Sequence, residues 1–273
     1  MWTDTTRAQY ARADLNLPSD LTDAEWAVLE PFLPPPSNVG RPRKWPLRRI
    51  VEAILYLLRG GLPWRMLPPC FPPVSTVRRW FYLWRDSNLW QSLNHTLLLI
   101  AREGSGREAS PSAGIIDSQS VKTTESGGPC GYDAGKKVNG RKRHILTDTE
   151  GNLVHAVIHT ADIQDRDGAP TVLAQIIGRF PWLRHIFADG GYAGVKLKDA
   201  LRRIGAWAVE IVKRSDAAKG FVVLPRRWVV ERTLAWLNRN RRLAKDFEQT
   251  IASATTWLFI ASIQLFTRRI ARS

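Results

Sequence analysis

The first third of the chain has apolar residues at the spacing of amphipathic helices. This pattern predicts three helices, over residues 22–33, 47–59 and 76–86. The first begins with a capping-box pattern at Thr22 and Glu25, and the last follows a proline-rich connection that ends at Ser75, a candidate N-cap. Residues 103–113 are rich in glycine and serine, which indicates a linker.

Beyond residue 113 the apolar pattern becomes typical of strands. A short apolar run, residues 113–117, predicts one strand, and a hairpin signal at Glu150-Gly151-Asn152 predicts two more, over residues 141–149 and 153–160. The pattern then predicts helix 168–179, strand 184–189, helix 194–203, strand 206–212 and helix 226–243. Three strands followed by α-β-α-β-α is the order of a ribonuclease H-like fold.

We therefore expect an α/β protein with two domains. Residues 1–108 form a mostly α-helical domain, and residues 109–273 form a ribonuclease H-like domain that ends in a packing helix. The uncharged stretch from Thr250 to Thr267 has nearly the length of a membrane span. Five Ser, Thr and Gln residues interrupt it, which favours a buried helix.

The charge of the chain predicts a polyanionic partner. The sequence has 40 Lys+Arg against 25 Asp+Glu, a net charge of +15. Residues 41–85 hold ten basic residues and one acid, and residues 223–273 hold ten basic residues and three acids. Two basic blocks predict two surfaces that contact double-stranded DNA, whereas the alternative is a generally basic protein.

Cysteine usage indicates a reducing compartment. Cys70 and Cys130 are the only cysteines and lie far apart, so neither a zinc site nor a disulfide framework is indicated. No signal-peptide pattern opens the chain. We therefore expect a cytoplasmic protein without a membrane partner.

Three acidic residues carry the candidate catalytic chemistry. Asp117 and Asp189 each end an apolar run, and Glu231 lies in the predicted helix 226–243. Carboxylates at the C-terminal tips of buried strands lie where open α/β folds bind ligands. With a helix carboxylate they can hold two Mg²⁺ ions, for which Mn²⁺ can substitute, and two such ions suit the cutting and rejoining of phosphodiester bonds. The alternative is that each aspartate merely closes a strand and caps a turn.

The helix around Glu231 has one narrow polar stripe. At about 100° per residue, the stripe contains Arg227, Glu231, Ala235, Asn238 and Arg242. We expect Arg227, Asn238 and Arg242 to hold a DNA strand against Glu231. The alternative is a surface pair between Arg227 and Glu231, worth about 0.5 kcal/mol.

A basic run opens the second predicted strand. If this strand is antiparallel to the first, then Lys142, Arg143 and His144 lie near Asp117 and can bind DNA there. Strand alternation directs Lys142 and His144 to one face of the sheet and Arg143 to the other. The alternative is a solvated charge run.

The first basic block supplies further candidate DNA contacts. The helices there are similar to a helix-turn-helix with an unusually long turn, and Arg78 and Arg79 lie on the helix expected to face DNA. Arg41 and Arg43 belong to a proline-stiffened loop that suits a narrow minor groove.

Three motifs occur together in this chain. They are Ile115-Ile116-Asp117-Ser118-Gln119-Ser120-Val121-Lys122, Ala188-Asp189-Gly190-Gly191-Tyr192 and Arg227-Trp228-Val229-Val230-Glu231-Arg232-Thr233. In combination they resemble the Asp-Asp-Glu transposases of bacterial insertion sequences, most closely the insertion-sequence-five family. The resemblance runs from about residue 20 to the C-terminus. In the signature of the broader group, Arg227 and Glu231 match, whereas Leu224 and Asn238 replace a tyrosine and a lysine.

The resemblance implies DNA transposition by cutting and joining. The N-terminal helices would bind the terminal inverted repeats of the element, and joining two ends implies a homodimer on the DNA, close to the bacterial nucleoid. Two alternatives stay open. A ribonuclease H-like nuclease or resolvase would cut without joining, and a DNA-binding regulator derived from a transposase would tolerate loss of an acidic residue.

Overall fold

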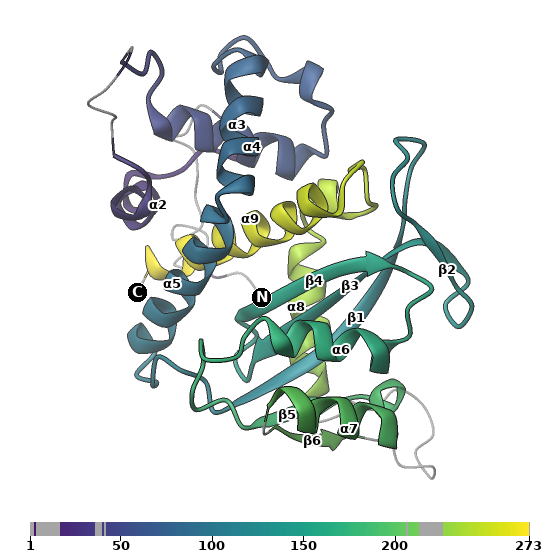
Figure 1. Cartoon of the computed structure of the whole chain (residues 1–273). Coiled ribbons are helices and arrows are strands. Elements are labelled where there is room, and N and C mark those ends of the chain that lie inside the picture. Colours follow the sequence, from purple (N-terminus) through teal and green to yellow (C-terminus); the bar gives the residue numbers. More distant parts are fainter. Residues whose placement is uncertain are drawn as a thin grey trace.

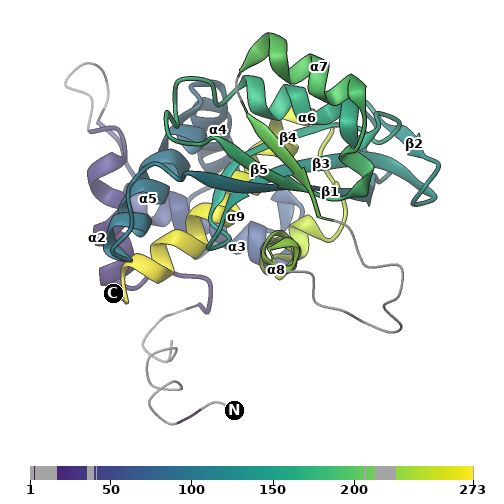
Figure 2. The same cartoon turned by 90° about the horizontal axis from the view of Figure 1, so that it is seen from below.

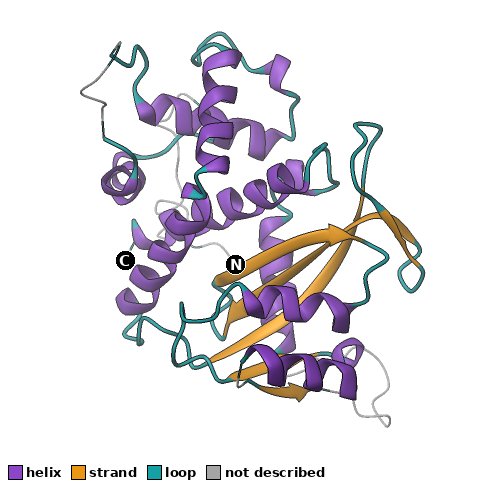
Figure 3. Ribbon diagram, viewed as in Figure 1, coloured by secondary structure: helices purple, strands orange, loops and turns teal. Residues whose placement is uncertain are grey.

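A mixed β-sheet and a group of N-terminal helices lie on either side of the C-terminal helix in the computed structural model (Figure 1). The structure describes residue 3 and residues 17–35, 40, 42–205, 207–212 and 226–272. Figure 3 shows the strands gathered in one half of the molecule and the N-terminal helices in the other.

The N-terminal helices are α2 (Asp23–Leu29), α3 (Leu47–Gly60), α4 (Val74–Asp86) and α5 (Leu89–Gly104), with 3₁₀ turns η1 (Glu30–Phe32) and η2 (Trp64–Met66). The predicted capping box is confirmed, because the Glu25 N–H donates to Thr22 Oγ1 and the Thr22 N–H donates to the Glu25 carboxylate, both at 3.1 Å. Helix α5 was not predicted.

The sheet has six strands: β1 (Ala113–Lys122), β2 (Gly131–Asp133), β3 (Val138–Asp148), β4 (Leu153–Thr160), β5 (His185–Ala188) and β6 (Ala208–Ile211). Strand β3 pairs in antiparallel fashion with β1, β2 and β4, whereas β1, β5 and β6 are parallel. The predicted order of three long strands followed by α-β-α-β-α is confirmed, with the short β2 added.

The second half of the chain supplies helices α6 (Asp165–Ala174), α7 (Val195–Ile204), α8 (Arg227–Leu237) and α9 (Ile251–Ile270), with 3₁₀ turns η3 (Gly190–Tyr192) and η4 (Arg241–Leu243). Figure 2 shows α6 and α7 on one side of the sheet and α8 on the other. The predicted helix 226–243 is too long, because α8 ends at Leu237.

Helix α9 connects the two halves of the molecule. It packs against α5 and the other N-terminal helices and against β4. Phe81 of α4 stacks on Trp257 of α9, with ring centroids 4.7 Å apart. The predicted packing helix is confirmed, since even Ser262, Gln264 and Thr267 are buried. Among the residues that the structure describes, no helix combines the length and apolarity needed to cross a membrane.

Candidate active site and nucleic-acid interface

Asp117 and Asp189 lie side by side on neighbouring strands. The parallel register pairs Gly114 with Ile186 and Ile115 with Phe187, and its continuation places Asp117 next to Asp189. Asp117 does not end its strand as predicted, because β1 continues to Lys122. It lies instead where the neighbouring β5 ends, so the two carboxylates still meet at the edge of the parallel part of the sheet.

Local backbone contacts hold both aspartates in place. Asp117 Oδ1 accepts the N–H of Ser118 at 2.7 Å. Asp189 is the N-cap of η3, and its Oδ1 accepts the N–H of Gly191 at 2.8 Å. Each contact occupies one carboxylate oxygen, and Asp189 Oδ2 lies 3.7 Å from the guanidinium of Arg227.

The surroundings of Asp117 disfavour its negative charge. Burial raises the pKa of Asp117 to about 6, with a smaller contribution from Asp189, against the opposing effects of the Ser118 N–H, Lys136 and Arg227. A half-buried carboxylate beside a second carboxylate is stabilised in its charged form by a cation. Oxygen donors of this kind fit Mg²⁺ or Mn²⁺.

Arg227 links Asp189 to Glu231. Its Nη2 lies 3.3 Å from Glu231 Oε1 and 3.7 Å from Asp189 Oδ2. The Glu231 side chain is 53% exposed. Within the described ranges, no group of three His, Cys, Asp or Glu side chains lies close enough to hold a metal ion. The structure thus brings Asp117 and Asp189 together and attaches Glu231 to them through Arg227.

The side chains of Lys142 and His144, which were predicted to contact DNA, are both buried, and this argues against that role. Strand β3 does run antiparallel to β1, with Ser118 opposite His144. However, Lys142 is 4% exposed and its Nζ lies 2.9 Å from Asp165 Oδ1. Burial and the neighbouring His159 hold the pKa of His144 well below its usual range, so this ring is neutral near pH 7. Neither residue presents a cation to phosphate.

Arg143 is likewise a structural residue. It is 2% exposed and donates to the carbonyl oxygens of Leu243 at 2.7 Å and Lys245 at 3.3 Å. The predicted alternation is confirmed, since Arg143 lies on the α8 face of the sheet and Lys142 on the α6 face. Its guanidinium holds the segment after α8 against the sheet, and this argues against the predicted DNA contact.

The polar stripe of the predicted helix is interrupted. Asn238 is the C-cap of α8 and is half-buried. Arg242 lies beyond the helix in η4, where it is 6% exposed, forms a 2.6 Å ion pair with Glu248 and covers the Trp257 ring. This burial argues against the predicted DNA contact of Arg242 as well. Arg239 and Arg241, by contrast, are exposed.

The N-terminal region presents an exposed basic face. Arg78 and Arg79 of α4 are both exposed. A groove separates α4 from the loop before α3, and Arg43, Lys44, Arg79 and Trp80 are among the residues that line it. The Arg43 guanidinium lies over the Trp80 ring, 5.8 Å from its centroid. Arg41 and Leu224 lie outside the described residues.

Sequence reasoning missed several groups around Asp117. Lys136, in the turn before β3, donates from Nζ to Ser118 O at 3.0 Å, and Ser118 Oγ donates to Asp165 at 2.8 Å. Tyr192, 1% exposed, lies against His144 behind the carboxylates. The serine within the Asp117 motif was a signal for this network, whereas Lys136 in a glycine-rich loop had none.

Comparisons with known proteins match both parts of the chain to transposase family models. The family model described as "Transposase DDE domain" matches residues 108–266, and that described as "Putative transposase of IS4/5 family" matches residues 21–94. The "Putative transposase for insertion sequence element IS402" of Burkholderia cepacia is 34% identical over 121 residues, covering 40% of this chain and 54% of the relative.

A second Burkholderia cepacia protein is also similar. The "Insertion element IS402 uncharacterized 16.2 kDa protein" is 31% identical over 113 residues, covering 39% of this chain and 76% of the relative. The chain thus spans about half the length of the first relative and three quarters of the second. No solved structure matches the chain.

Proposed function

We propose that this chain, which belongs to the family of proteins with a transposase DDE domain, is a DNA transposase that cleaves the ends of a mobile element and joins them to target DNA. The observation that carries the proposal is the pair of strand-end carboxylates, Asp117 and Asp189, with Arg227 between Asp189 and Glu231. The fold that the family implies is ribonuclease H-like, and the sheet order supports it.

Asp117 and Asp189, which lie side by side, and Glu231, which would have to approach them from its present position beside Arg227, are the proposed ligands of two Mg²⁺ ions. When bound, these ions supply activation of the attacking oxygen and stabilisation of the leaving oxygen at the scissile phosphate. The raised pKa of Asp117 fits this role, because a nearby cation restores its charged form. Mn²⁺ is expected to substitute, since it too prefers oxygen ligands.

Arg227 is the proposed phosphate-binding residue of the site. Its guanidinium is held between two carboxylates and is only partly exposed. If a metal ion balanced the charge of these carboxylates, Arg227 could turn its planar donor face to a phosphate, which such a fork binds with two hydrogen bonds. In this way Arg227 would place the phosphate of the DNA strand next to the acidic residues.

DNA ends are the proposed ligand of the N-terminal helices. Residues 1–108 would bind the terminal inverted repeats through the helix-turn-helix-like face of α4, with Arg78 and Arg79 exposed on it. Residues 109–273 would carry out the chemistry. Since two ends must be joined, the working form on DNA is proposed to be a homodimer.

The test is a strand-transfer assay with labelled element-end DNA, a target plasmid and Mg²⁺. We expect cleaved ends and joined product from the wild-type chain. We expect neither product from Asp117→Ala, Asp189→Ala or Glu231→Ala, each of which should keep its DNA affinity because the basic residues are unchanged. An Asp199→Ala variant, altered on α7, is the matched control.

Each alternative has its own outcome in the same assay. Cleavage without joining would indicate a nuclease, and binding without cleavage would indicate a regulator. An alanine variant of any of the three acidic residues with near-normal cleavage would refute the assignment of that residue.

A further inference from the structure

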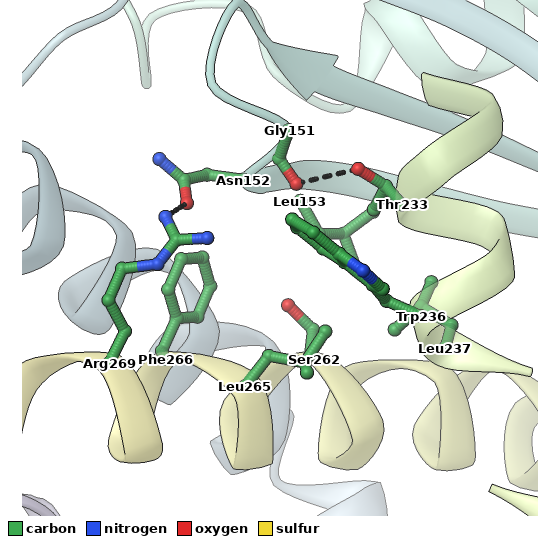
Figure 4. Close-up of a pocket in the computed structure, with 10 residues that line it drawn as sticks. All are labelled: Gly151, Asn152, Leu153, Thr233, Trp236, Leu237, Ser262, Leu265, Phe266 and Arg269. Carbon is green, nitrogen blue, oxygen red and sulfur yellow. Dashed lines mark hydrogen bonds between the residues drawn. The ribbon is translucent and has the colours of Figure 1, made fainter. Parts of the chain in front are cut away.

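The face of α8 opposite Glu231 is fastened to the β3–β4 turn. Thr233 is 1% exposed, and its Oγ1 lies 2.8 Å from the carbonyl oxygen of Gly151, to which it donates, as well as 3.0 Å from that of Val229 within the helix. A buried helical threonine needs only the bond within its own helix to satisfy its hydroxyl. The bond to Gly151 is not needed for that purpose, and it connects α8 to the β3–β4 turn (Figure 4).

A second contact fastens α8 to the same turn. Arg232 Nη2 donates to the carbonyl oxygen of Glu150 at 2.8 Å. Gly151 has φ 89°, and a Cβ at this position would lie 2.7 Å from Thr233 Oγ1 and 3.2 Å from the Arg232 guanidinium. The turn thus needs glycine both for its backbone conformation and for the close approach of α8.

The turn is itself fixed to both halves of the molecule. Asp148 is fully buried and forms a 2.5 Å ion pair with Arg102 of α5, while its other oxygen accepts the N–H groups of Glu150 and Asn152 at 2.9 Å each. Arg269 of α9 donates to the Asn152 side chain (Figure 4). These bonds make the turn a rigid support for α8.

There is little free space at this contact. The cavity among Gly151, Thr233, Trp236 and Phe266 measures about 10 Å³, room for at most about one water molecule. Helix α8 consequently cannot rotate about its axis without breaking the bonds to the turn. Glu231 lies two residues before Thr233, about 200° away around the helix, so a fixed Thr233 directs Glu231 towards the opposite side.

We propose that Thr233 is a positioning residue for the reaction, which holds α8 at the rotation that aligns Glu231 and Arg227 with Asp117 and Asp189. This inference rests on the proposed function. Thr233 is buried, and its hydroxyl contacts the carbonyl oxygens of Gly151 and Val229 instead of the carboxylates, so it acts through the helix. Its loss should therefore lower the rate of cleavage at saturating DNA and leave the affinity for DNA ends unchanged.

The test compares three variants of the full chain. Thr233→Val removes the hydroxyl at nearly constant volume, and Thr233→Ser restores it. The matched control is Thr267→Val in α9, because Thr267 is equally buried and its hydroxyl donates only to Ile263 O of its own helix, at 2.8 Å. We measure single-turnover cleavage with saturating element-end DNA, DNA affinity, thermal unfolding and hydrogen exchange of α8 amides.

We expect Thr233→Val to lower the cleavage rate about tenfold to hundredfold, the range that a displacement of about 1 Å produces. Its DNA affinity should match that of the wild type, its α8 amides should exchange faster, and Thr233→Ser should recover most of the rate. Thr267→Val can lower the unfolding temperature but should leave the cleavage rate and α8 exchange unchanged. If Thr233→Val does not fold, Arg232→Lys, which loses the donor to Glu150, should show the same pattern.

Two failures are distinguishable. A wild-type chain that neither cleaves nor joins DNA would overturn the proposed function and, with it, the catalytic consequence. An active wild type whose Thr233→Val variant cleaves and exchanges normally, or loses rate only in proportion to unfolding as Thr267→Val does, would overturn the positioning role alone.

Discussion

Replacement of Asp117 by asparagine should stabilise the protein at neutral pH while it abolishes cleavage. The folded chain holds the Asp117 proton up to a pKa of about 6, against an ordinary value of 3.8. Between these two pH values the folded state binds a proton that the unfolded state has released, so stability falls as pH rises through this window. Well above pH 6 the wild-type chain has lost all of the stability that this bound proton supplies. The asparagine variant cannot ionise and therefore does not lose it.

The size of the effect follows from the same two values. A difference of about two pH units corresponds to about 3 kcal/mol, reached at pH 8, and only about 1 kcal/mol has been lost by pH 4.5. Because Asp117 is half-buried and solvent screens part of its charge, these free energies are upper bounds. The advantage of Asp117→Asn should therefore grow by about 1–2 kcal/mol between pH 4.5 and pH 8.

Urea unfolding at several pH values, without divalent cations, measures this difference directly. Other titrating groups cancel between the two proteins, and Asp199→Asn on α7 serves as the exposed control. Saturating Mg²⁺ should then stabilise the wild type, by about 2.7 kcal/mol at one hundred times its Kd, and should leave Asp117→Asn nearly unchanged. A pH-independent advantage, or none, would refute the reasoning.

Three further variants separate charge that faces DNA from charge that holds the fold. Arg227→Lys keeps the charge but loses the planar fork, so strand transfer should fall while the unfolding midpoint stays constant; normal transfer would argue for a mere surface pair. Arg79→Ala should weaken DNA binding and flatten its salt dependence by about one counterion, which gel shifts at several salt concentrations measure. Unchanged affinity and salt dependence would show that Arg79 does not contact DNA. Arg143→Met should instead lower the free energy of unfolding by about 1–3 kcal/mol without a change in DNA affinity, and a selective loss of affinity would contradict its structural role.

The elements predicted from the sequence were those whose pattern is local. The capping box at Thr22, the β3–β4 hairpin and the alternation of strands and helices after residue 113 each depend on a few neighbouring residues, and each was confirmed. The pairing of Asp117 with Asp189 followed from that alternation, because parallel neighbours end at the same sheet edge. The register brings the two residues together even though β1 extends beyond Asp117.

The burial of Arg143 and Arg242 was not visible in the local sequence. Arg143 is buried by carbonyl groups that follow it by about one hundred residues, and Arg242 by Glu248 and the ring of Trp257. Glu248 lies only six residues after Arg242, but a local charge pattern contains neither the distant carbonyl groups nor the covering ring. The same basic sequence pattern can thus belong to arginines that contact DNA or to buried arginines that donate to backbone carbonyl groups.

Net charge consequently overstates the DNA-binding surface of the second basic block. Arg242 neutralises Glu248, Arg269 bonds to Asn152, and Arg232 lies between the rings of Trp228 and Trp236. These three side chains fix α8, η4 and α9 in place, so this part of the block has a structural function. The exposed cations after α8, Arg239, Arg241 and Lys245, lie along one short segment.

The positions of the exposed basic residues bear on which part of the chain supplies the affinity for DNA. We expect most of the salt-dependent affinity to come from the N-terminal block, because Arg43, Arg78 and Arg79 lie together around one groove and helix there. The catalytic half would then contribute alignment instead of affinity. Such an arrangement explains why α8 is fastened through Thr233 to a turn that α5 and α9 also hold: the helical half that would bind the DNA end and the helix that carries Glu231 share one rigid support.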